Sequence, residues 1–131
     1  MNLLRRPRRN RKSESVRKWS AETTLDHSQL IYPLFVVDGK NEQQKIDALP
    51  GQFRWSPDTV LKTCEKVVDK GVGGIILFPA IEESLKNSQA SEALNPDNLV
   101  CKTVREIKKR FPDLPIMTDV ALDPFSSDGH D

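Results

Sequence analysis

Four carboxylates and one imidazole gather in the last thirteen residues of the chain, the acidic segment 119–131 (DVALDPFSSDGHD). The short apolar run 114–118 precedes them and is typical of a buried strand. Carboxylates at the carboxyl end of such a strand lie at the mouth of an α/β sheet or barrel, where these proteins carry their chemistry. Asp119, Asp123 and Asp131 are therefore candidates for binding a hard cation or for transferring protons.

The same residue types also fit a solvated acidic loop without any chemical role. Asp128 and Gly129 make a dipeptide that is common in plain turns. Gly129 also allows the backbone to fold closely around an ion or a substrate. Residue types alone leave both interpretations open.

Length and composition limit the class of protein. The chain has 131 residues, of which 37% are hydrophobic and 30% charged, with nine prolines. This composition permits one modest domain with a lean core. No apolar run approaches the roughly 18 residues of a membrane span. The N-terminus also lacks the apolar middle region of a secretory signal, so we expect a cytoplasmic protein without a membrane partner.

The two cysteines indicate a reducing environment. Cys64 and Cys101 each fall on the apolar face of a predicted helix, without a CxxC spacing or a second ligand cluster nearby. We expect two buried, reduced thiols. A structural disulfide is the alternative, and nothing else in the sequence points to an oxidising compartment.

The basic charge is concentrated at the N-terminus. Residues 1–20 hold eight Lys or Arg against one Glu, whereas the remainder holds twelve against eighteen acidic residues. The segment is poor in apolar residues and interrupted by Pro7, so it predicts an extended arm with Val16 and Trp19 as apolar contacts. Such an arm fits nucleic-acid phosphates, an organellar targeting peptide, or an acidic neighbour such as another subunit. We favour the acidic neighbour, because no recognition motif accompanies the basic residues.

The first half of the remaining chain predicts a strand followed by a helix. Residues 31–37 form an apolar, β-rich run ended by a turn, and Pro33 within it suggests an edge or early position. Ser56 and Pro57 are typical of a helix start, and Gly71 of the end of a helix that runs to about Lys70. The predicted buried face of this helix consists of Val60, Leu61, Cys64, Val67 and Val68.

The second half repeats the pattern. Residues 74–78 predict a strand that is buried on both faces and stopped by Pro79. Residues 82–95 form a loop long enough to be functional, with a solvated insertion as the alternative. Asn95 predicts the start of a second helix. Its expected buried face consists of Val100, Thr103, Val104, Ile107 and Phe111.

The order strand, helix, strand, helix, strand predicts a parallel α/β fold. No glycine-rich phosphate loop follows the first strand, which argues against a nucleotide-binding open sheet. A (β/α)8 barrel is the better interpretation. Eight units need about 250 residues, so this chain would hold only about two and a half units of a TIM barrel, after an extended N-terminal arm.

Several separated motifs carry a family resemblance. They are RRPRR, IYPLFVVDG, LPG at 49–51, SPD, ILFP, SEALNPDNLV and TDVALDPFSSDGHD. In this order and spacing they resemble the porphobilinogen synthase (5-aminolevulinate dehydratase) family over essentially the entire chain. The resemblance implies a basic arm at 1–25 and the N-terminal part of a TIM barrel at 26–131. It also implies a homo-octamer that assembles through the arm.

The activity that the resemblance implies is that of a lyase. The family condenses two 5-aminolevulinate molecules to porphobilinogen, with loss of two waters, on the way to haem. Asp119 matches an active-site aspartate, and Asp123 and Asp131 match metal-site positions. The zinc-dependent branch of the family has cysteines at the positions of Ala121, Asp123 and Asp131, so we expect magnesium or another hard cation rather than catalytic zinc.

The Schiff-base lysines and the substrate-binding residues of the family lie beyond the position of Asp131. Lys40, which follows the first predicted strand, is interpreted as a surface lysine. The portion 1–131 is therefore predicted to be inactive alone and, with open strand edges, prone to aggregate. The alternative is a truncated, non-enzymatic protein that associates with a full-length synthase or another acidic partner.

Overall fold

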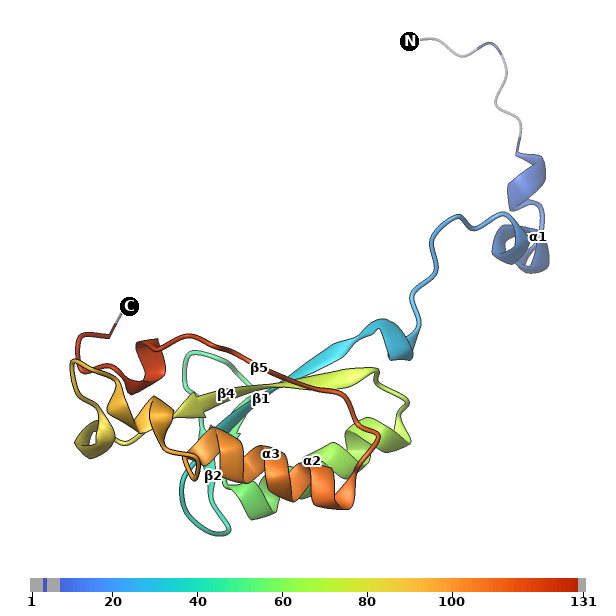
Figure 1. Ribbon diagram of the computed structural model, residues 1–131. Helices are drawn as coiled ribbons and strands as arrows, with labels where there is room; N and C mark the ends of the chain where they lie inside the picture. Colours follow the sequence, from blue (N-terminus) through green and yellow to red (C-terminus); the bar gives the residue numbers. More distant parts are fainter. Residues whose placement is uncertain (1–3, 5–7, 130–131) are drawn as a thin grey trace.

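The computed structural model describes residues 4 and 8–129, and its body is one mixed sheet covered by two helices (Figure 1). The strands are β1 (Ile31–Val37), β2 (Gln43–Lys45), β3 (Phe53–Trp55), β4 (Gly74–Ala80) and β5 (Ile116–Thr118). Their order is β2-β3-β1-β4-β5, and all neighbours are parallel except β2 and β3. The helices are α2 (Pro57–Asp69) and α3 (Leu99–Arg110). In this described part, no helix is long and apolar enough to cross a membrane.

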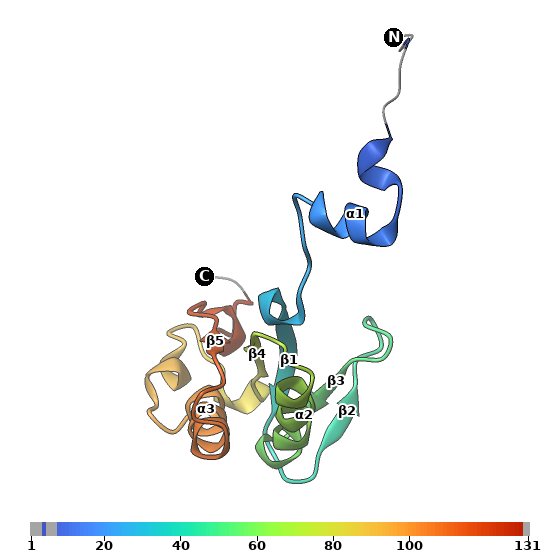
Figure 2. The same ribbon diagram turned by 90° about the vertical axis from the view of Figure 1, so that its right-hand side faces the viewer.

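Both crossover helices lie on the same face of the sheet (Figure 2). The core joins β1 and β4 to both helices, with Leu34, Ile75 and Leu77 packed in one cluster with Val60 of α2 and Ile107 of α3. A sheet wound in one direction with its helices on one side is the arrangement of a (β/α)8 barrel, whereas a doubly wound sheet carries helices on both faces. The fold is thus the first part of a barrel, as the sequence predicts.

The opposite face of the sheet is less buried. Along β4 the side chains alternate, with Ile75 and Leu77 buried and Ile76 and Phe78 only half-buried. The prediction of a strand buried on both faces is therefore wrong for this chain. Phe78 stacks on Phe35 of β1, with ring centroids 5.7 Å apart. In a closed barrel this face lines the interior, where further side chains cover it.

The two prolines in the strands lie where no neighbour needs their missing N–H. β3 pairs with β1 only at Phe35 and Val36, so Pro33 precedes the first pair on that side. β5 pairs with β4 only as far as Leu77, so Pro79 follows the last pair there. Pro33 therefore lies at a locally open edge although β1 is central. Pro79 does not end the strand, which continues to Ala80 and corrects our expected boundary.

Helix α2 begins and ends as predicted, but one side chain that was predicted to be buried is exposed. Gly71 takes a left-handed conformation (φ +67°), and the N–H groups of Gly71 and Val72 donate to the carbonyls of Val68 and Val67. This is the Schellman ending that a glycine allows. Val68, which was expected on the buried face, is 45% exposed because it lies on the solvent edge of the helix.

The start of α3 differs from the prediction by three residues. Asn98 is the N-cap, and its Oδ1 accepts a hydrogen bond from the N–H of Cys101 at 2.9 Å. Asn95 instead closes a preceding turn, accepting from the N–H of Asp97 at 2.9 Å. The sequence offers two asparagines with capping ability, and packing of Leu99 into the core selects the second.

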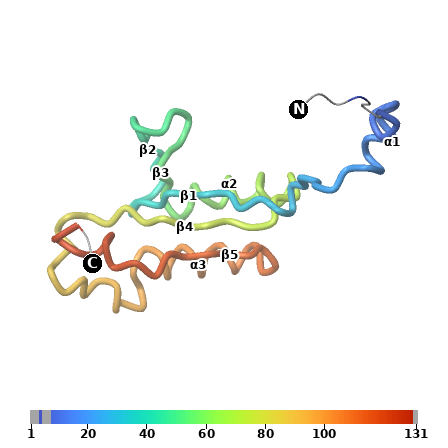
Figure 3. The backbone as a smooth tube through the Cα atoms, turned by 90° about the horizontal axis from the view of Figure 1, so that it is seen from above, coloured from blue at the N-terminus to red at the C-terminus, as the bar shows by residue number. Residues whose placement is uncertain are grey.

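A β-hairpin formed by β2 and β3 occupies the stretch that the sequence suggested was only a polar connection. Figure 3 shows it on one side of β1 and β4. Ser56, the N-cap of α2, makes no capping bond with its side chain; its hydroxyl accepts from the N–H of Glu42 at 2.9 Å. The same hydroxyl donates to Asp58 at 2.6 Å. The hairpin is thus tied to the start of α2.

The N-terminal arm stands away from the body of the protein (Figure 1). Instead of a fully extended chain it contains a 3-10 turn, Arg9–Arg11, and a short helix α1, Glu14–Trp19. Ser13 caps α1, because its side chain accepts from the N–H of Val16. Trp19 is 84% exposed and Leu25 82% exposed, so the body of the protein does not cover these apolar side chains.

Both cysteines are free thiols. Cys64 is buried in the core, and this burial raises its pKa to about 11. Cys101 is only half-buried, so our expectation of two buried thiols holds for Cys64 alone. A buried thiol with a raised pKa is a poor nucleophile, which leaves Cys64 a packing role.

Candidate functional site

The candidate site lies at the carboxyl end of the parallel strands, where three connections meet. Asp38 follows β1, the loop 82–95 follows β4, and the acidic segment follows β5. In Figure 1 the described end of the acidic segment lies beside the loop 82–95, at the carboxyl end of β4. Carboxyl ends of barrel strands are where barrel enzymes carry their reacting groups.

Asp119 is the first residue after β5 and is exposed to solvent. Its Oδ1 accepts a hydrogen bond from the N–H of Ala121 at 3.3 Å, which orients the carboxylate within its own turn. It borders a pocket of about 390 Å³ together with Val100 and Cys101 of α3 and Leu94. The structure thus places Asp119 at the rim of a largely apolar pocket, where a small polar molecule could reach it.

Asp123 is held differently from Asp119. It is half-buried and begins the 3-10 turn η5, Asp123–Phe125, whose Phe125 is buried. The carbonyl of Asp123 accepts from the N–H of Ser126 at 3.3 Å. The backbone of Asp123 is therefore fixed by its own turn and by the burial of Phe125.

A complete metal site is not formed by the residues that the structure describes. Among residues 4 and 8–129, no three His, Cys, Asp or Glu side chains are grouped closely enough to hold an ion. Asp131, the third predicted site residue, lies outside the described residues, as does His130. The donor atoms of Asp123 and Asp131 are carboxylate oxygens, which suit a hydrated hard cation bound through one or two side chains.

The loop 82–95 is joined to the acidic segment by a parallel bridge between Asn87 and Ser126. The N–H of Asn87 donates to the carbonyl of Phe125 at 3.3 Å, and the N–H of Ser127 donates to the carbonyl of Asn87 at 3.2 Å. We call this pair of bonds the 87–126 bridge. The loop is therefore a structural neighbour of the predicted site, although most of its side chains are exposed.

Asn87 also organises its own loop, a role that our sequence reasoning missed. Its Oδ1 accepts from the N–H groups of Gln89 and Ser91, both at 3.1 Å. Its Nδ2 donates to the hydroxyl of Ser91 at 2.6 Å. An asparagine that accepts from the backbone two residues later is an Asx-turn, and the Asn87-Ser-Gln sequence carried that signal.

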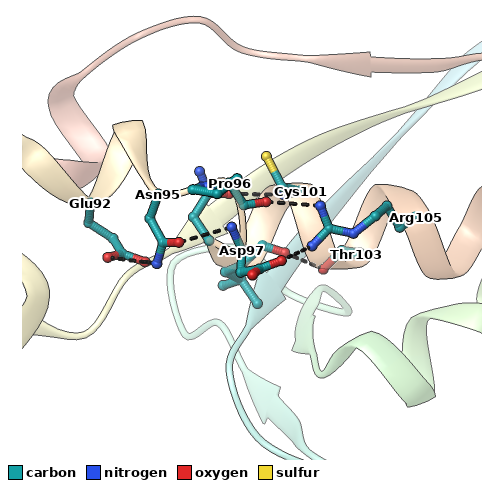
Figure 4. A network of polar contacts seen from close by, with 9 residues as sticks. Glu92, Asn95, Pro96, Asp97, Cys101, Thr103 and Arg105 are labelled. Carbon is teal, nitrogen blue, oxygen red and sulfur yellow. Dashed lines mark hydrogen bonds and ion pairs between the residues drawn. The ribbon is translucent and has the colours of Figure 1, made fainter.

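A second polar network fixes the entry to α3 (Figure 4). Arg105 donates to the carbonyl of Pro96 at 2.9 Å and to the carboxylate of Asp97 at 2.5 Å. Asn95 donates to Glu92 at 3.0 Å. These bonds keep the segment 92–97 folded against its own helix, and none of them involves Asn87, Phe125 or Ser127 of the 87–126 bridge.

Lys40, the lysine closest to the end of β1, is exposed in the turn that follows the strand. This exposure matches its interpretation as a surface lysine. At the carboxyl end of the strands, the described groups with a candidate chemical role are therefore the carboxylates of Asp119 and Asp123.

A family model described as "Delta-aminolevulinic acid dehydratase" matches residues 4–131. The chain is 46% identical over 131 residues to a delta-aminolevulinic acid dehydratase of Bradyrhizobium diazoefficiens, covering all of this chain and 37% of that protein. It is 48% identical over 133 residues to a chloroplastic delta-aminolevulinic acid dehydratase of Selaginella martensii, covering all of this chain and 31% of that protein.

The fold also matches that of a solved structure. The crystal structure of delta-aminolevulinic acid dehydratase (porphobilinogen synthase) from Toxoplasma gondii, in complex with the reaction product porphobilinogen, superimposes with a TM-score of 0.91 at 42% identity. The match covers 98% of this chain and 36% of that chain. The chain spans 37% and 31% of the two relatives above, and 36% of this structure.

Proposed function

Because the chain belongs to the delta-aminolevulinic acid dehydratase family, we propose that its native gene product condenses two 5-aminolevulinate molecules to porphobilinogen, releasing two waters. The observation that carries the proposal is the family match over residues 4–131, which includes the segment that places Asp119 at the carboxyl end of β5. The native product would then be a lyase of tetrapyrrole and haem synthesis.

In this proposal residues 26–131 supply the first two and a half βα units of the barrel, and residues 1–25 form a separate arm. Support comes from the single-sided winding of the sheet and from the superposition on the Toxoplasma gondii structure. The remaining strands and the Schiff-base lysines would come from residues beyond Asp131. Residues 1–131 alone would then be inactive, because a Schiff base requires an amine held in an apolar pocket.

Asp119 is the proposed catalytic residue of this portion. A carboxylate at the rim of a pocket can accept a hydrogen bond from the amino group of 5-aminolevulinate and can take a proton from it. The hydrogen bond from Ala121 orients the carboxylate before the substrate arrives. The buried Phe125 and the half-buried Val100 beside the pocket favour exclusion of water around a bound substrate.

Asp123 and Asp131 are the proposed metal ligands. Both offer hard carboxylate oxygens, and none of the three positions Ala121, Asp123 and Asp131 carries a cysteine for tetrahedral zinc. A magnesium ion bound there would supply positive charge beside the reacting groups. Asp119, in contrast, acts on the substrate directly in this proposal.

The arm is the proposed contact between subunits of a homo-octamer. Its exposed Trp19 and Leu25 and its excess of Arg and Lys suit an acidic neighbouring surface, and the rest of the chain carries more acidic than basic residues. The proposed compartment is the cytoplasm, with the plastid as the alternative because several relatives are chloroplastic. Subcellular fractionation separates these two locations.

The test is the intact mass of the native gene product, measured together with its formation of porphobilinogen from 5-aminolevulinate. We expect a mass well above 14.8 kDa and product formation. A mass of 14.8 kDa without product formation would contradict the proposal. It would favour the alternative, a non-enzymatic protein that associates through its arm with a full-length synthase or another acidic partner.

A further inference from the structure

We propose that Asn87 is a positioning residue for the acidic segment, and that it acts by holding the 87–126 bridge in place. The inference deepens the proposed function and rests on it, because the segment it positions contains Asp119 and Asp123. Asn87 itself follows β4 and lies in a different loop from these aspartates. It does not need to touch the substrate to affect the reaction.

The backbone carbonyl of Asn87 accepts two hydrogen bonds. The carbonyl of Asn87 accepts from the N–H of Ser127 at 3.2 Å and from the N–H of Ala90 at 3.0 Å. The first bond joins the two loops, and the second closes the turn 87–90. The direction of this carbonyl therefore depends on the turn that carries it.

The Asn87 side chain stabilises this turn. Its Oδ1 binds the N–H groups of Gln89 and Ser91. Ala90 between them has a left-handed backbone (φ +49°) and is 4% exposed. A non-glycine residue in that conformation costs free energy and persists only when its surroundings hold it. Without the Asn87 side chain, the turn loses two of the bonds that hold Ala90 there.

Ser126 connects the 87–126 bridge to the turn that begins at Asp123. The N–H of Ser126 donates to the carbonyls of Leu122 at 3.0 Å and Asp123 at 3.3 Å, and Ser126 is itself buried. A shift of Ser126 therefore moves the turn that begins at Asp123. Misplacement of reacting groups by about 1 Å can cost up to about a hundredfold in rate, even from a distant substitution.

Asn95 provides a matched control on the same loop. It also forms an Asx-turn, accepting from the N–H of Asp97 at 2.9 Å, and its side chain donates to Glu92 at 3.0 Å. These bonds stay within residues 92–97. Asn95→Ala should therefore disturb a comparable turn without disturbing the acidic segment.

The experiment compares Asn87→Ala, Asn87→Asp and Asn95→Ala in the native gene product, measuring kcat, KM and the thermal midpoint. We expect Asn87→Ala to lower kcat about tenfold and to change KM less than about twofold. A small shift of the aspartates should slow the reaction of bound substrate more than it weakens substrate binding. Asn87→Asp, which keeps the accepting oxygen, should retain at least about half of the wild-type kcat, and so should Asn95→Ala. Both Ala variants should lose similar thermal stability.

Three results would overturn the inference. They are an unchanged kcat in Asn87→Ala, an equal loss in Asn95→Ala, and a failure of Asn87→Asp to restore activity. If Asn87→Ala does not fold, Ser91→Ala provides the test. It removes the hydroxyl that accepts from the Asn87 side chain and leaves the backbone bonds of the turn in place. We then expect kcat to fall about threefold, and an unchanged value would refute the role of the turn.

Hydrogen exchange separates this inference from the proposed function. In wild type the Ser127 amide is bonded to Asn87, so Asn87→Ala should speed its exchange about tenfold or more, whereas Asn95→Ala should not. If the native product makes no porphobilinogen, the proposed function fails, and exchange at Ser127 still tests the positioning role. Equal exchange in both variants would refute it.

Discussion

The two ends of the parallel strands are built in different ways. At the amino end, short turns connect α2 to β4 and α3 to β5, and their backbones are tightly bound. The N–H of Val72 donates to Val67, and the ammonium of Lys108 donates to the carbonyl of Leu114 at 2.8 Å. At the carboxyl end, long loops carry carboxylates and strongly exposed apolar side chains, such as Val120, which is 90% exposed.

This difference separates the part that stabilises the fold from the part that carries the proposed chemistry. Turns at the amino end carry no residue of the candidate site, so changes there should alter stability. Loops at the carboxyl end leave a pocket beside Asp119, so changes there should alter activity.

Removing the proposed proton-transfer group should have the largest effect. In the native gene product, Asp119→Asn keeps the shape of the side chain but not its basicity, and should lower kcat by about 10²- to 10⁴-fold. The thermal midpoint should change little, because Asp119 is exposed. Steady-state porphobilinogen formation measures the effect, and an active Asp119→Asn protein would remove Asp119 from the mechanism.

Gly73→Ala should give the largest loss of stability. A Cβ at Gly73 would lie 1.9 Å from the carbonyl oxygen of Ser28, so the segment before β1 would have to move. We expect a loss of about 1–3 kcal/mol or more in the free energy of unfolding, measured in urea.

Gly71→Ala is the control for Gly73→Ala, because open space surrounds its Cβ position and only the left-handed backbone is strained. It should cost about 1–2 kcal/mol. A Gly73→Ala protein as stable as Gly71→Ala would show that the amino-end turn tolerates more than its packing suggests.

Asp58, a carboxylate at the carboxyl end of the strands that is hydrogen-bonded within the fold, should make the stability of the protein depend on pH. The hydroxyl of Ser56, and then the N–H of Asn41, lower the pKa of Asp58 from its ordinary value. The stabilisation is therefore present above the unfolded pKa of about 4 and is lost as the pH falls through the folded pKa. The stability difference between wild type and Asp58→Asn should shrink below about pH 4, and a constant difference from pH 7 to 3 would contradict this.

The smallest effect should come from the ion pair between α2 and α3. Arg110 and Glu65 lie 3.2 Å apart, and each side chain is 52% exposed. Solvent screens such a pair, so Glu65→Gln should cost at most about 1 kcal/mol in urea unfolding. A larger loss would mean that the helix pair depends on charge as well as on its apolar core.

The alternation of apolar runs and amphipathic helices was enough to predict β1, α2 and the parallel order of the strands. Hydrophobic periodicity reports the burial of local segments, and these elements bury one face each. The sequence could not distinguish Asn98 from Asn95 as the start of α3, because both residues can cap a helix and tertiary packing decides between them. It also could not reveal the hairpin of β2 and β3, whose short strands are polar or mixed.

The position of Asp119 in the fold was predictable for the same reason, whereas its catalytic role stays a prediction. Asp119 follows an apolar strand, so its place at the carboxyl edge could be inferred from local sequence. The 87–126 bridge joins residues that lie far apart along the chain, and no local pattern reports such a contact. The assignments of Asp123 and Asp131 to a metal stay predictions.

A crystal structure of the native gene product with bound porphobilinogen tests the central claim most directly. We predict that the product lies at the carboxyl end of the strands, with the Asp119 carboxylate within hydrogen-bonding distance, about 2.6–3.2 Å, of a product nitrogen or of a water bound to it. Product bound at the amino end of the strands, or far from Asp119, would contradict the separation between a stabilising end and a reactive end.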